Sequence, residues 1–250
     1  MNLIILKEQD KLSGDTYILK DNRAEHIRTI LKLSVDDKIE IGILNGSVGK
    51  AVIDKISETG IRLKITDLSN PPQVSPIIDL ICALPRPQTL KKILFTSAMM
   101  NVRQLHLVRA NRVEKSYYQS PLLEKNNYEP FLLEGLAQGK FTRIPEVVVH
   151  QKFKPFFEDT LIELESKLSK KRSIKLLPDL GAGYKLPNFL NKEIDHLFIA
   201  IGPEGGWVPF EIEIMKKKGF QCINLGPWTL RVEHAVTAVL AQAAIFRGSK

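Results

Sequence analysis

The chain of 250 residues has only two cysteines, Cys82 and Cys222, and each lies inside a short apolar run. We therefore expect two buried thiols in a reducing compartment rather than a disulfide framework. No apolar run is long enough to cross a bilayer, and residues 1–10 lack the basic start and the cleavage site of a signal peptide. These absences predict a cytoplasmic protein with no membrane partner.

Several common catalytic motifs are also missing. The five histidines are scattered and form no cluster with the cysteines, so we expect no metal site. The chain has no G-x-G-x-x-G fingerprint, no Walker loop and no serine in a nucleophile elbow. A nucleotide-dependent metabolic enzyme is therefore disfavoured.

What the chain does have is an excess of positive charge. Its 36 Lys and Arg outnumber 28 Asp and Glu, giving a formal net charge of +8. An excess of this kind favours a polyanionic partner, nucleic acid before membrane, although a generally lysine-rich surface is an alternative. With 44% apolar residues, the chain can bury a core in one large or two small domains.

The first part of the chain has the pattern of a small β-barrel. Residues 38–43, 48–56 and 61–65 alternate apolar with other residues, Asn45-Gly46 favours a hairpin turn, and residues 23–33 suggest one short helix. The adjacent prolines Pro71 and Pro72 predict a boundary between a domain at 1–70 and a second at 73–250. Basic residues of the first domain are expected either to contact RNA phosphates or to form a solvated face: Arg23, Arg28 and Lys32.

The second part alternates strands with helices, which predicts an α/β fold with a mostly parallel sheet. The expected strands are 77–84, 105–108, 145–149, 173–177, 197–201 and 222–225. The expected helices are 88–101, 128–138, 153–170, 209–218 and 232–246. Arg112 lies in a basic, tyrosine-containing loop that suits RNA, or that is an ordinary exposed crossover.

Two glycine-containing loops follow two of these strands. The first is Gly202-Pro203-Glu204-Gly205-Gly206 and the second is 226–231. Ligands of open α/β sheets bind at the carboxyl ends of the strands, where glycines let the backbone approach closely and a helix start offers free N–H groups. The two loops therefore predict a cradle for a nucleoside-like cofactor.

The two loops together resemble a known paired signature. Ile201-Gly202-Pro203-Glu204-Gly205-Gly206, followed by Leu225-Gly226-Pro227, Leu230-Arg231 and Glu233, is similar to the SPOUT methyltransferases and, more narrowly, to the RsmE family. Residues 26–33 and 138–146 also resemble parts of that family. The resemblance implies a C-terminal SPOUT domain with a trefoil-knotted sheet and a PUA-like N-terminal barrel. It implies S-adenosylmethionine as cofactor, a homodimer, and methylation of N3 of a uridine in 16S small-subunit ribosomal RNA.

The resemblance also implies roles for individual residues. Arg231 and Glu233 would be catalytic: Arg231 would stabilise the uracil anion or hold phosphate, while Glu233 would accept a proton or orient Arg231. The alternative for this pair is a structural salt bridge within the knot. Arg112 and Arg143 would contact RNA. The cofactor would be bound mainly through backbone by Leu180, Gly181, Ile201, Gly202, Glu204, Gly205, Gly206, Leu225, Gly226, Leu230 and Arg231.

The chain departs from the family pattern at residues 96–102, 137–141 and 232–235. Two alternatives therefore stay open. One is a SPOUT enzyme acting on another RNA atom, such as a ribose 2′-hydroxyl, and the other is a non-catalytic RNA-binding assembly factor. The helix at 232–246, apolar around most of its circumference, is expected to be buried in a core or against a second copy.

Overall fold

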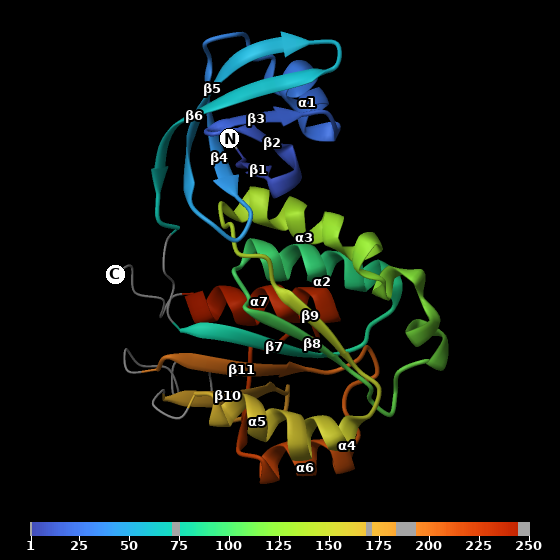
Figure 1. Ribbon diagram of the computed structural model, residues 1–250. Helices are drawn as coiled ribbons and strands as arrows, with labels where there is room; N and C mark the ends of the chain where they lie inside the picture. The colour runs from blue at the N-terminus through green and yellow to red at the C-terminus, as the bar shows by residue number, and fades with distance from the viewer. Residues whose placement is uncertain (1, 72–75, 169–171, 184–193, 245–250) are drawn as a thin grey trace.

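The computed structural model describes residues 2–71, 76–168, 172–183 and 194–244. Figure 1 shows two parts, a curled sheet formed by the N-terminal residues and a parallel sheet between helices formed by the rest. Each sheet has six strands. The predicted α/β class with an N-terminal barrel-like half is confirmed.

The N-terminal sheet has the order β1-β4-β5-β6-β3-β2. Only β1 and β4 pair in parallel, and the other neighbours are antiparallel. Alternate side chains point into one apolar core with Ile27 from the helical segment. The strands are β1 (Ile4–Leu6), β2 (Lys11–Ser13), β3 (Thr16–Leu19), β4 (Lys38–Ile43), β5 (Val48–Ser57) and β6 (Gly60–Ser69).

The predicted short helix of this half is two pieces. Asp21 accepts a hydrogen bond from the Arg23 N–H at 3.1 Å and starts α1 (Asn22–His26). A π-helical turn, η2 (Ile27–Leu31), follows and ends at Lys32, whose φ is 52°. The segment therefore ends two residues earlier than the pattern indicates, because Lys32 adopts the left-handed conformation.

The C-terminal sheet has the order β12-β10-β11-β7-β8-β9, and every neighbouring pair is parallel. Because all strands run the same way, their carboxyl ends meet at one edge. The strands are β7 (Ile77–Ala83), β8 (Gln104–Val108), β9 (Glu146–His150), β10 (Ser173–Pro178), β11 (His196–Ile201) and β12 (Phe220–Ile223). The last strand begins and ends two residues before the predicted range, because Leu225 belongs to the following loop.

Helices cover both faces of this sheet, as Figure 1 shows. On one face lie α2 (Pro87–Met99), α3 (Lys125–Gly139) and α7 (Val232–Ala244), packed on a core that includes Leu80 and Ile199. On the other lie α4 (Phe153–Pro155), η5 (Phe156–Thr160), α5 (Leu161–Ser166) and α6 (Pro209–Lys217), packed around Ile81 and Phe198. The helix predicted at 153–170 is thus three joined segments, and residues 169–171 lie outside the described part.

Helix α7 is not buried all round in the single chain. Val236, Val239 and Leu240 are buried, whereas His234 and Thr237 on the opposite side are exposed. The core accounts for one face of this helix. Residues 245–250 of the predicted range lie outside the described part.

The two halves contact each other through α3 and the segment after it. The Leu3 N–H donates to the Ala137 carbonyl at 3.0 Å, and the Asn45 N–H donates to the Thr142 carbonyl at 2.8 Å. Lys140 forms an ion pair of 2.6 Å with Glu40. These contacts fix the barrel against the helical layer.

The two cysteines are free thiols. Cys82 is fully buried, as expected, and burial raises the pKa of its thiol. Cys222 is only half-buried, because β12 is an edge strand. No helix in the described ranges is long and apolar enough to span a membrane.

Candidate active site

A cavity of about 830 Å³ lies at the carboxyl ends of four neighbouring strands, β12, β10, β11 and β7. Asp179 and Leu180 come from the loop after β10, and residues 202–206 from the loop after β11. Arg86 follows β7, and Leu225 follows β12. The cavity is therefore where the strand order of an open α/β sheet predicts a ligand.

The first glycine loop turns sharply beside a tryptophan. The Gly206 N–H donates to the Pro203 carbonyl at 2.8 Å, and Gly206 has a φ of 73°, which favours glycine. A Cβ atom on Gly202 would lie 3.1 Å from the Trp207 indole. The indole is nine-tenths buried, and its Nε1 has no hydrogen-bond partner in the described part of the chain. The indole thus covers Gly202, whereas a Cβ atom on Gly206 would meet only open space.

At the start of α6, the Glu211 carboxylate accepts a hydrogen bond from the Val208 N–H at 3.0 Å and one from the Asn111 N–H, outside the helix, at 2.7 Å. One N–H group at this helix start is therefore already bonded to a carboxylate. That the helix start attracts an anionic ligand stays a prediction.

The second glycine loop is tied to the loop after β10. Asn224 accepts from the Gly226 N–H at 2.7 Å and donates to the Leu180 carbonyl at 2.8 Å. Gly226 has a φ of 139°, and the Trp228 ring lies over it, so close that a Cβ would be 2.4 Å from Cζ3. Only glycine fits beneath this ring.

Three cations and three acids line the cavity, and four of them form pairs. Arg86 lies 3.2 Å from Glu204, and Lys92 lies 3.0 Å from Glu233. Arg231 is exposed and has no ion pair or side-chain hydrogen bond with any other described residue. Its charge is therefore available to an anionic ligand.

The Glu233 carboxyl is held as an anion. Burial raises its pKa, but hydrogen bonds from its own backbone N–H and from Lys92 lower it more, so the pKa of Glu233 is below its ordinary value. The expected contact between Glu233 and Arg231 is absent from the described residues, where Glu233 pairs with Lys92 instead. A carboxylate held in this way is a weak proton acceptor.

Most of the residues predicted to bind the cofactor meet in this cavity. The lining includes Leu180, Ile201, Gly202, Glu204, Gly205, Gly206, Leu225, Leu230 and Arg231. Gly181 lies one residue beyond it, where its N–H donates to Asp179 at 3.0 Å. Gly226 lies beneath Trp228 and is not among the lining residues.

The predicted RNA-contacting residues lie in two places. Arg112 is beside the cavity, where its guanidinium donates to the Gly205 carbonyl. Arg143 lies on the segment before β9 with its side chain exposed at the surface. Partial burial of the guanidinium, together with the nearby Arg103, lowers the pKa of Arg143. Lys32 is exposed in the barrel.

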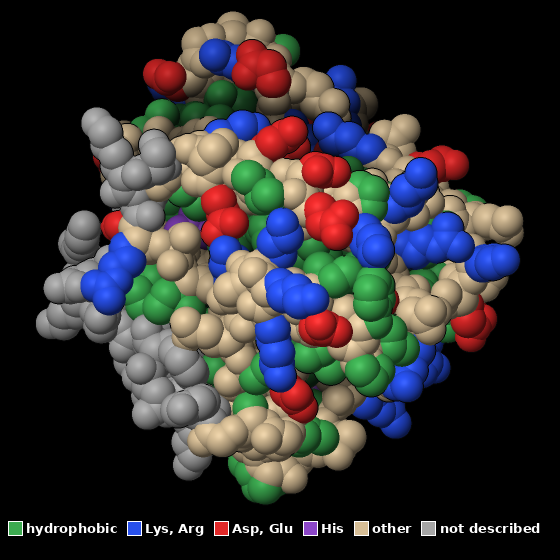
Figure 2. Space-filling view, turned by 90° about the horizontal axis from the view of Figure 1, so that it is seen from below, with side chains coloured by type: hydrophobic (Ala, Val, Ile, Leu, Met, Phe, Trp, Pro, Cys, Tyr) green, Lys and Arg blue, Asp and Glu red, His purple; other side chains and the backbone are tan. Residues whose placement is uncertain are grey.

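Two other barrel arginines are held in place. Arg23 forms ion pairs with Asp10 at 2.6 Å and Asp21 at 2.7 Å, and Arg28 donates to the Ser57 carbonyl. Figure 2 shows one face of the molecule, on which Lys and Arg side chains are interspersed with acidic and apolar ones. The net charge is thus not gathered into one uniform patch on that face.

Among the lining residues that sequence reasoning missed are Arg86, Lys92, Trp207 and Trp228. Arg86 directly follows a strand that was predicted, so the rule of carboxyl ends could have found it. The chain has only two tryptophans, and both lie at this cavity, so the rarity of this residue type in the sequence could have drawn attention to them. Among the described residues, no group of three or more His, Cys, Asp or Glu could hold a metal ion.

The chain is similar to known proteins over nearly its whole length. The "Ribosomal RNA small subunit methyltransferase E" of Treponema pallidum is 28% identical over 250 residues, covering 96% of this chain and 90% of that protein. The "Ribosomal RNA small subunit methyltransferase E 1" of Borreliella burgdorferi is 28% identical over 253 residues, covering 100% and 98% of the two chains.

Solved structures share the fold. The crystal structure of a ribosomal RNA small subunit methyltransferase E from Neisseria gonorrhoeae, bound to S-adenosyl methionine, matches with a TM-score of 0.76 at 19% identity and covers 98% of each chain. A family model described as "RNA methyltransferase domain" matches residues 73–244, well over half of the chain. The chain therefore belongs to the RNA methyltransferase family, and the relation to RsmE that its two loop motifs predict is confirmed.

Proposed function

We propose that this protein transfers a methyl group from S-adenosylmethionine to N3 of a specific uridine in 16S small-subunit ribosomal RNA. The observation that carries the proposal is the cavity formed by the loops after β10, β11 and β12, with Arg231 at its wall and no described residue paired with that arginine. The names of the relatives support the ribosomal substrate, and a solved neighbour with bound S-adenosylmethionine supports the cofactor.

The cavity fits the cofactor in shape and chemistry. Leu177, Ile201 and Leu225 provide apolar walls for an adenosine, and the open space at Gly206 allows close approach to the backbone. Asn224 holds the two flanking loops together. The proposed cofactor-binding residues are those that the sequence predicts, with Gly181 and Gly226 acting through the shape of their loops. When bound, the cofactor supplies a methyl group activated by a positively charged sulfur.

The protein must then position the uridine and manage one proton. The N3 atom becomes a competent nucleophile only when its proton passes to water, which leaves negative charge on the uracil. We assign the stabilisation of that charge to the exposed guanidinium of Arg231, which pairs with no described residue. Glu233, which has a lowered pKa, is better suited to hold Lys92 at the cavity wall than to accept the proton.

Recognition of the RNA is assigned to both halves. Lys32, Arg112 and Arg143 are exposed and keep their predicted role in contacting RNA. The side chains of Arg23 and Arg28 are anchored in the barrel. These two arginines therefore remain in the proposal only as contributors of positive charge. N3 lies on the base-pairing edge, so the target uridine must be unpaired or flipped out.

The proposal includes the organisation that the resemblance implies. We propose a PUA-like domain at 1–70, a knotted SPOUT domain at 73–250, and a homodimer acting on ribosomal RNA in the cytoplasm. The exposed side of α7 is available for the second copy. Light scattering on the purified chain tests the dimer, which would double the mass of one chain.

The decisive experiment is nucleoside mass spectrometry of ribosomal RNA from cells with and without the protein. Loss of N3-methyluridine, restored by the wild-type gene, is the expected result. Loss of a 2′-O-methylated nucleoside instead would assign the other SPOUT reaction. No lost mark, with RNA binding retained by the purified protein, would support the assembly factor.

A further inference from the structure

Trp228 is the most exposed aromatic side chain in the part of the chain that the structure describes. It leaves 65% of its surface open to solvent, whereas the buried Trp207 leaves 9%. An exposed ring of this size is costly in water and commonly marks a binding surface. Its position at the wall of the cavity gives it a candidate ligand.

The ring is held in place from one side only. It lies over Gly226, in a loop that Asn224 fixes by accepting the Gly226 N–H at 2.7 Å. Among the described residues, no other aromatic ring and no cation contacts Trp228. The loop therefore orients a large π surface whose other side is free.

Burial divides the cavity into an inner and an outer part. The inner wall is apolar, with Leu177 and Ile201 almost fully buried. The outer part carries Trp228, Arg86 and Arg231, all exposed. The adenosine of the cofactor suits the inner wall, so the exposed ring is left for the second substrate.

Proteins commonly bind single-stranded RNA with an aromatic ring and nearby arginines. The bases stack on the aromatic face, and the cations meet the phosphates. We propose that Trp228 stacks on an unpaired base of the substrate RNA at the mouth of the cavity and thereby positions the target uridine. This inference rests on the proposed methyl transfer to RNA and adds a positioning residue to it.

The test uses the full chain and the variants Trp228→Leu and Trp228→Phe. Leucine keeps an apolar side chain but removes the π face, and phenylalanine keeps a smaller ring. Stacking of a base on an aromatic side chain predicts that Trp228→Leu weakens binding of hexauridylate, and raises KM for small ribosomal subunits, by about fivefold to a hundredfold. Trp228→Phe should retain most of the affinity, and the affinity for S-adenosylmethionine should change less than about twofold in both variants.

Phe210→Leu is the matched control, since Phe210 is also an exposed aromatic, with 52% of its surface open, but does not line the cavity. Fluorescence gives a direct readout, because the chain has only two tryptophans. Hexauridylate should quench the emission of the wild type and much less that of Trp228→Phe. Melting temperatures establish that each variant is folded.

Two results would overturn the assignment. Weaker binding of S-adenosylmethionine with unchanged RNA affinity would place the ring on the adenine of the cofactor. Unchanged binding of both would leave the ring without a role. Failure of the proposed function is distinguishable: a wild type that binds hexauridylate through Trp228 but methylates no RNA keeps the stacking and loses the reaction. A Trp228→Leu variant that methylates RNA with an unchanged KM would refute the stacking and keep the proposed reaction.

Discussion

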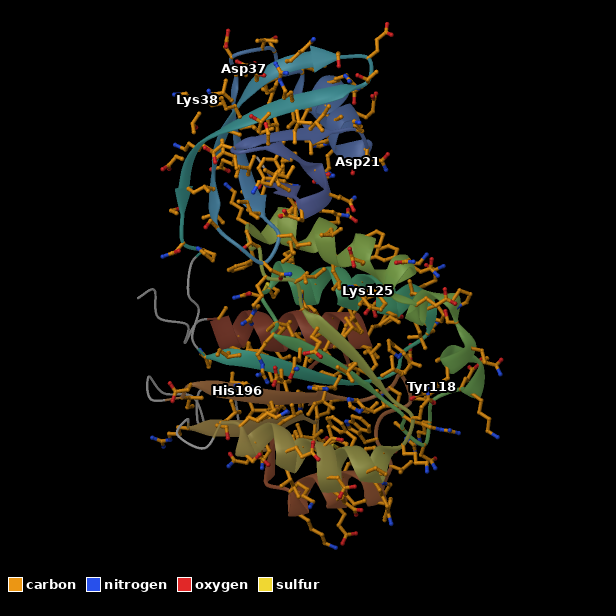
Figure 3. The ribbon with its side chains drawn as sticks, viewed as in Figure 1. Asp21, Asp37, Lys38, Tyr118, Lys125 and His196 are labelled. Carbon is orange, nitrogen blue, oxygen red and sulfur yellow. The ribbon has the colours of Figure 1, made fainter. Side chains whose placement is uncertain are left out.

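The two ends of the parallel sheet treat charge in opposite ways. At the amino ends, Asp79 and His196 are fully buried, and the His196 Nε2 lies 3.0 Å from the Asp79 carboxylate, which Arg103 also contacts. At the carboxyl ends, the charged side chains surround an open cavity, and Arg231 has no described partner. Figure 3 labels His196 near one end of the sheet and Tyr118, from the loop after β8, near the other.

The difference separates residues that hold the fold from residues available for chemistry. Burial raises the pKa of Asp79, but hydrogen bonds from His196 and Arg103 lower it more, so the pKa of this carboxyl is below its ordinary value. The negative charge of Asp79 is compensated by Arg103 and His196 inside the network. Arg86 and Arg231 at the rim of the cavity are exposed to water, and a ligand can replace that water.

Breaking the buried network should have the largest effect on stability. Asp79→Asn removes the charge that compensates Arg103, and loss of one partner of a buried pair costs about 3–5 kcal/mol of unfolding free energy. Urea unfolding measures this loss, and methyl transfer at a temperature where the variant is folded should be nearly unchanged. Asp159→Asn, at an exposed position on η5, is the control. A loss below about 1 kcal/mol would contradict the assignment of Asp79 to stability.

Arg231→Ala should have the reverse profile. Removal of one group that stabilises developing negative charge typically costs about 100- to 1,000-fold in rate. The free energy of unfolding should change by less than about 0.5 kcal/mol, because the side chain is exposed and unpaired in the described structure. Single-turnover methylation of small subunits measures the rate. Arg62→Ala, which removes a half-buried arginine of the barrel paired with Asp54, should leave it unchanged, and a fully active Arg231→Ala would remove Arg231 from the mechanism.

The same comparison shows what could be predicted from the sequence. The glycine loops at 202–206 and 226–231 carry a local signature, and the strands before them are apolar, so the position of the cavity could be predicted from the sequence. The pairs of contacting side chains could not be predicted. Lys92 meets Glu233 across 141 residues, and Asp79 meets His196 across 117. Such pairs depend on strand register and helix packing rather than on local pattern.

One of these pairs did leave a signal. Asp79 stands inside an apolar run, and a carboxylate in a buried strand needs a partner. The start of α6 shows the opposite limit, since its N–H groups were predicted free, whereas the Val208 N–H is bonded to the Glu211 carboxylate. A side chain that closes a site cannot be told from one that leaves it open without the fold.

A smaller effect should appear as a dependence of stability on pH. Burial, first, lowers the pKa of His106 to about 4; His150 and Arg103 lower it further, while Asp79 and Glu146 act against them. Because the unfolded chain binds a proton with a pKa near 6.5, stability falls as the pH decreases from about 6.5 towards 4. The loss between pH 7 and 5 should be roughly 2 kcal/mol from this group.

The variant His106→Phe removes that contribution and keeps an aromatic ring against Phe156, and it also removes the contact of 3.1 Å between His106 Nδ1 and His150 Nε2. Urea unfolding at pH 7 and pH 5 should show a difference smaller by about 2 kcal/mol than in the wild type. Asp79 does not interfere, because a carboxyl with a lowered pKa loses its contribution only below about pH 4. An identical difference in both proteins would mean that His106 is not the group that titrates.

The smallest effect distinguishes two adjacent glycines of the cofactor loop. Gly206 has a φ of 73°, so Gly206→Ala should cost about 1 kcal/mol through backbone strain, although a Cβ there would touch nothing. At Gly205 a Cβ would lie 3.2 Å from the flexible Arg112 side chain, which can move aside. Gly205→Ala should therefore change stability by less than about 0.5 kcal/mol.

Calorimetric titration with S-adenosylmethionine then separates loop shape from general stability. Gly14→Ala carries the same kind of strain, with a φ of 50° and open space around it, but lies in the barrel. It should lose a similar stability and bind the cofactor normally, whereas Gly206→Ala should bind it several-fold more weakly. Equal affinities in the two variants would mean that the 202–206 loop adapts to its ligand, and that the carboxyl end of the sheet is not built to a fixed shape.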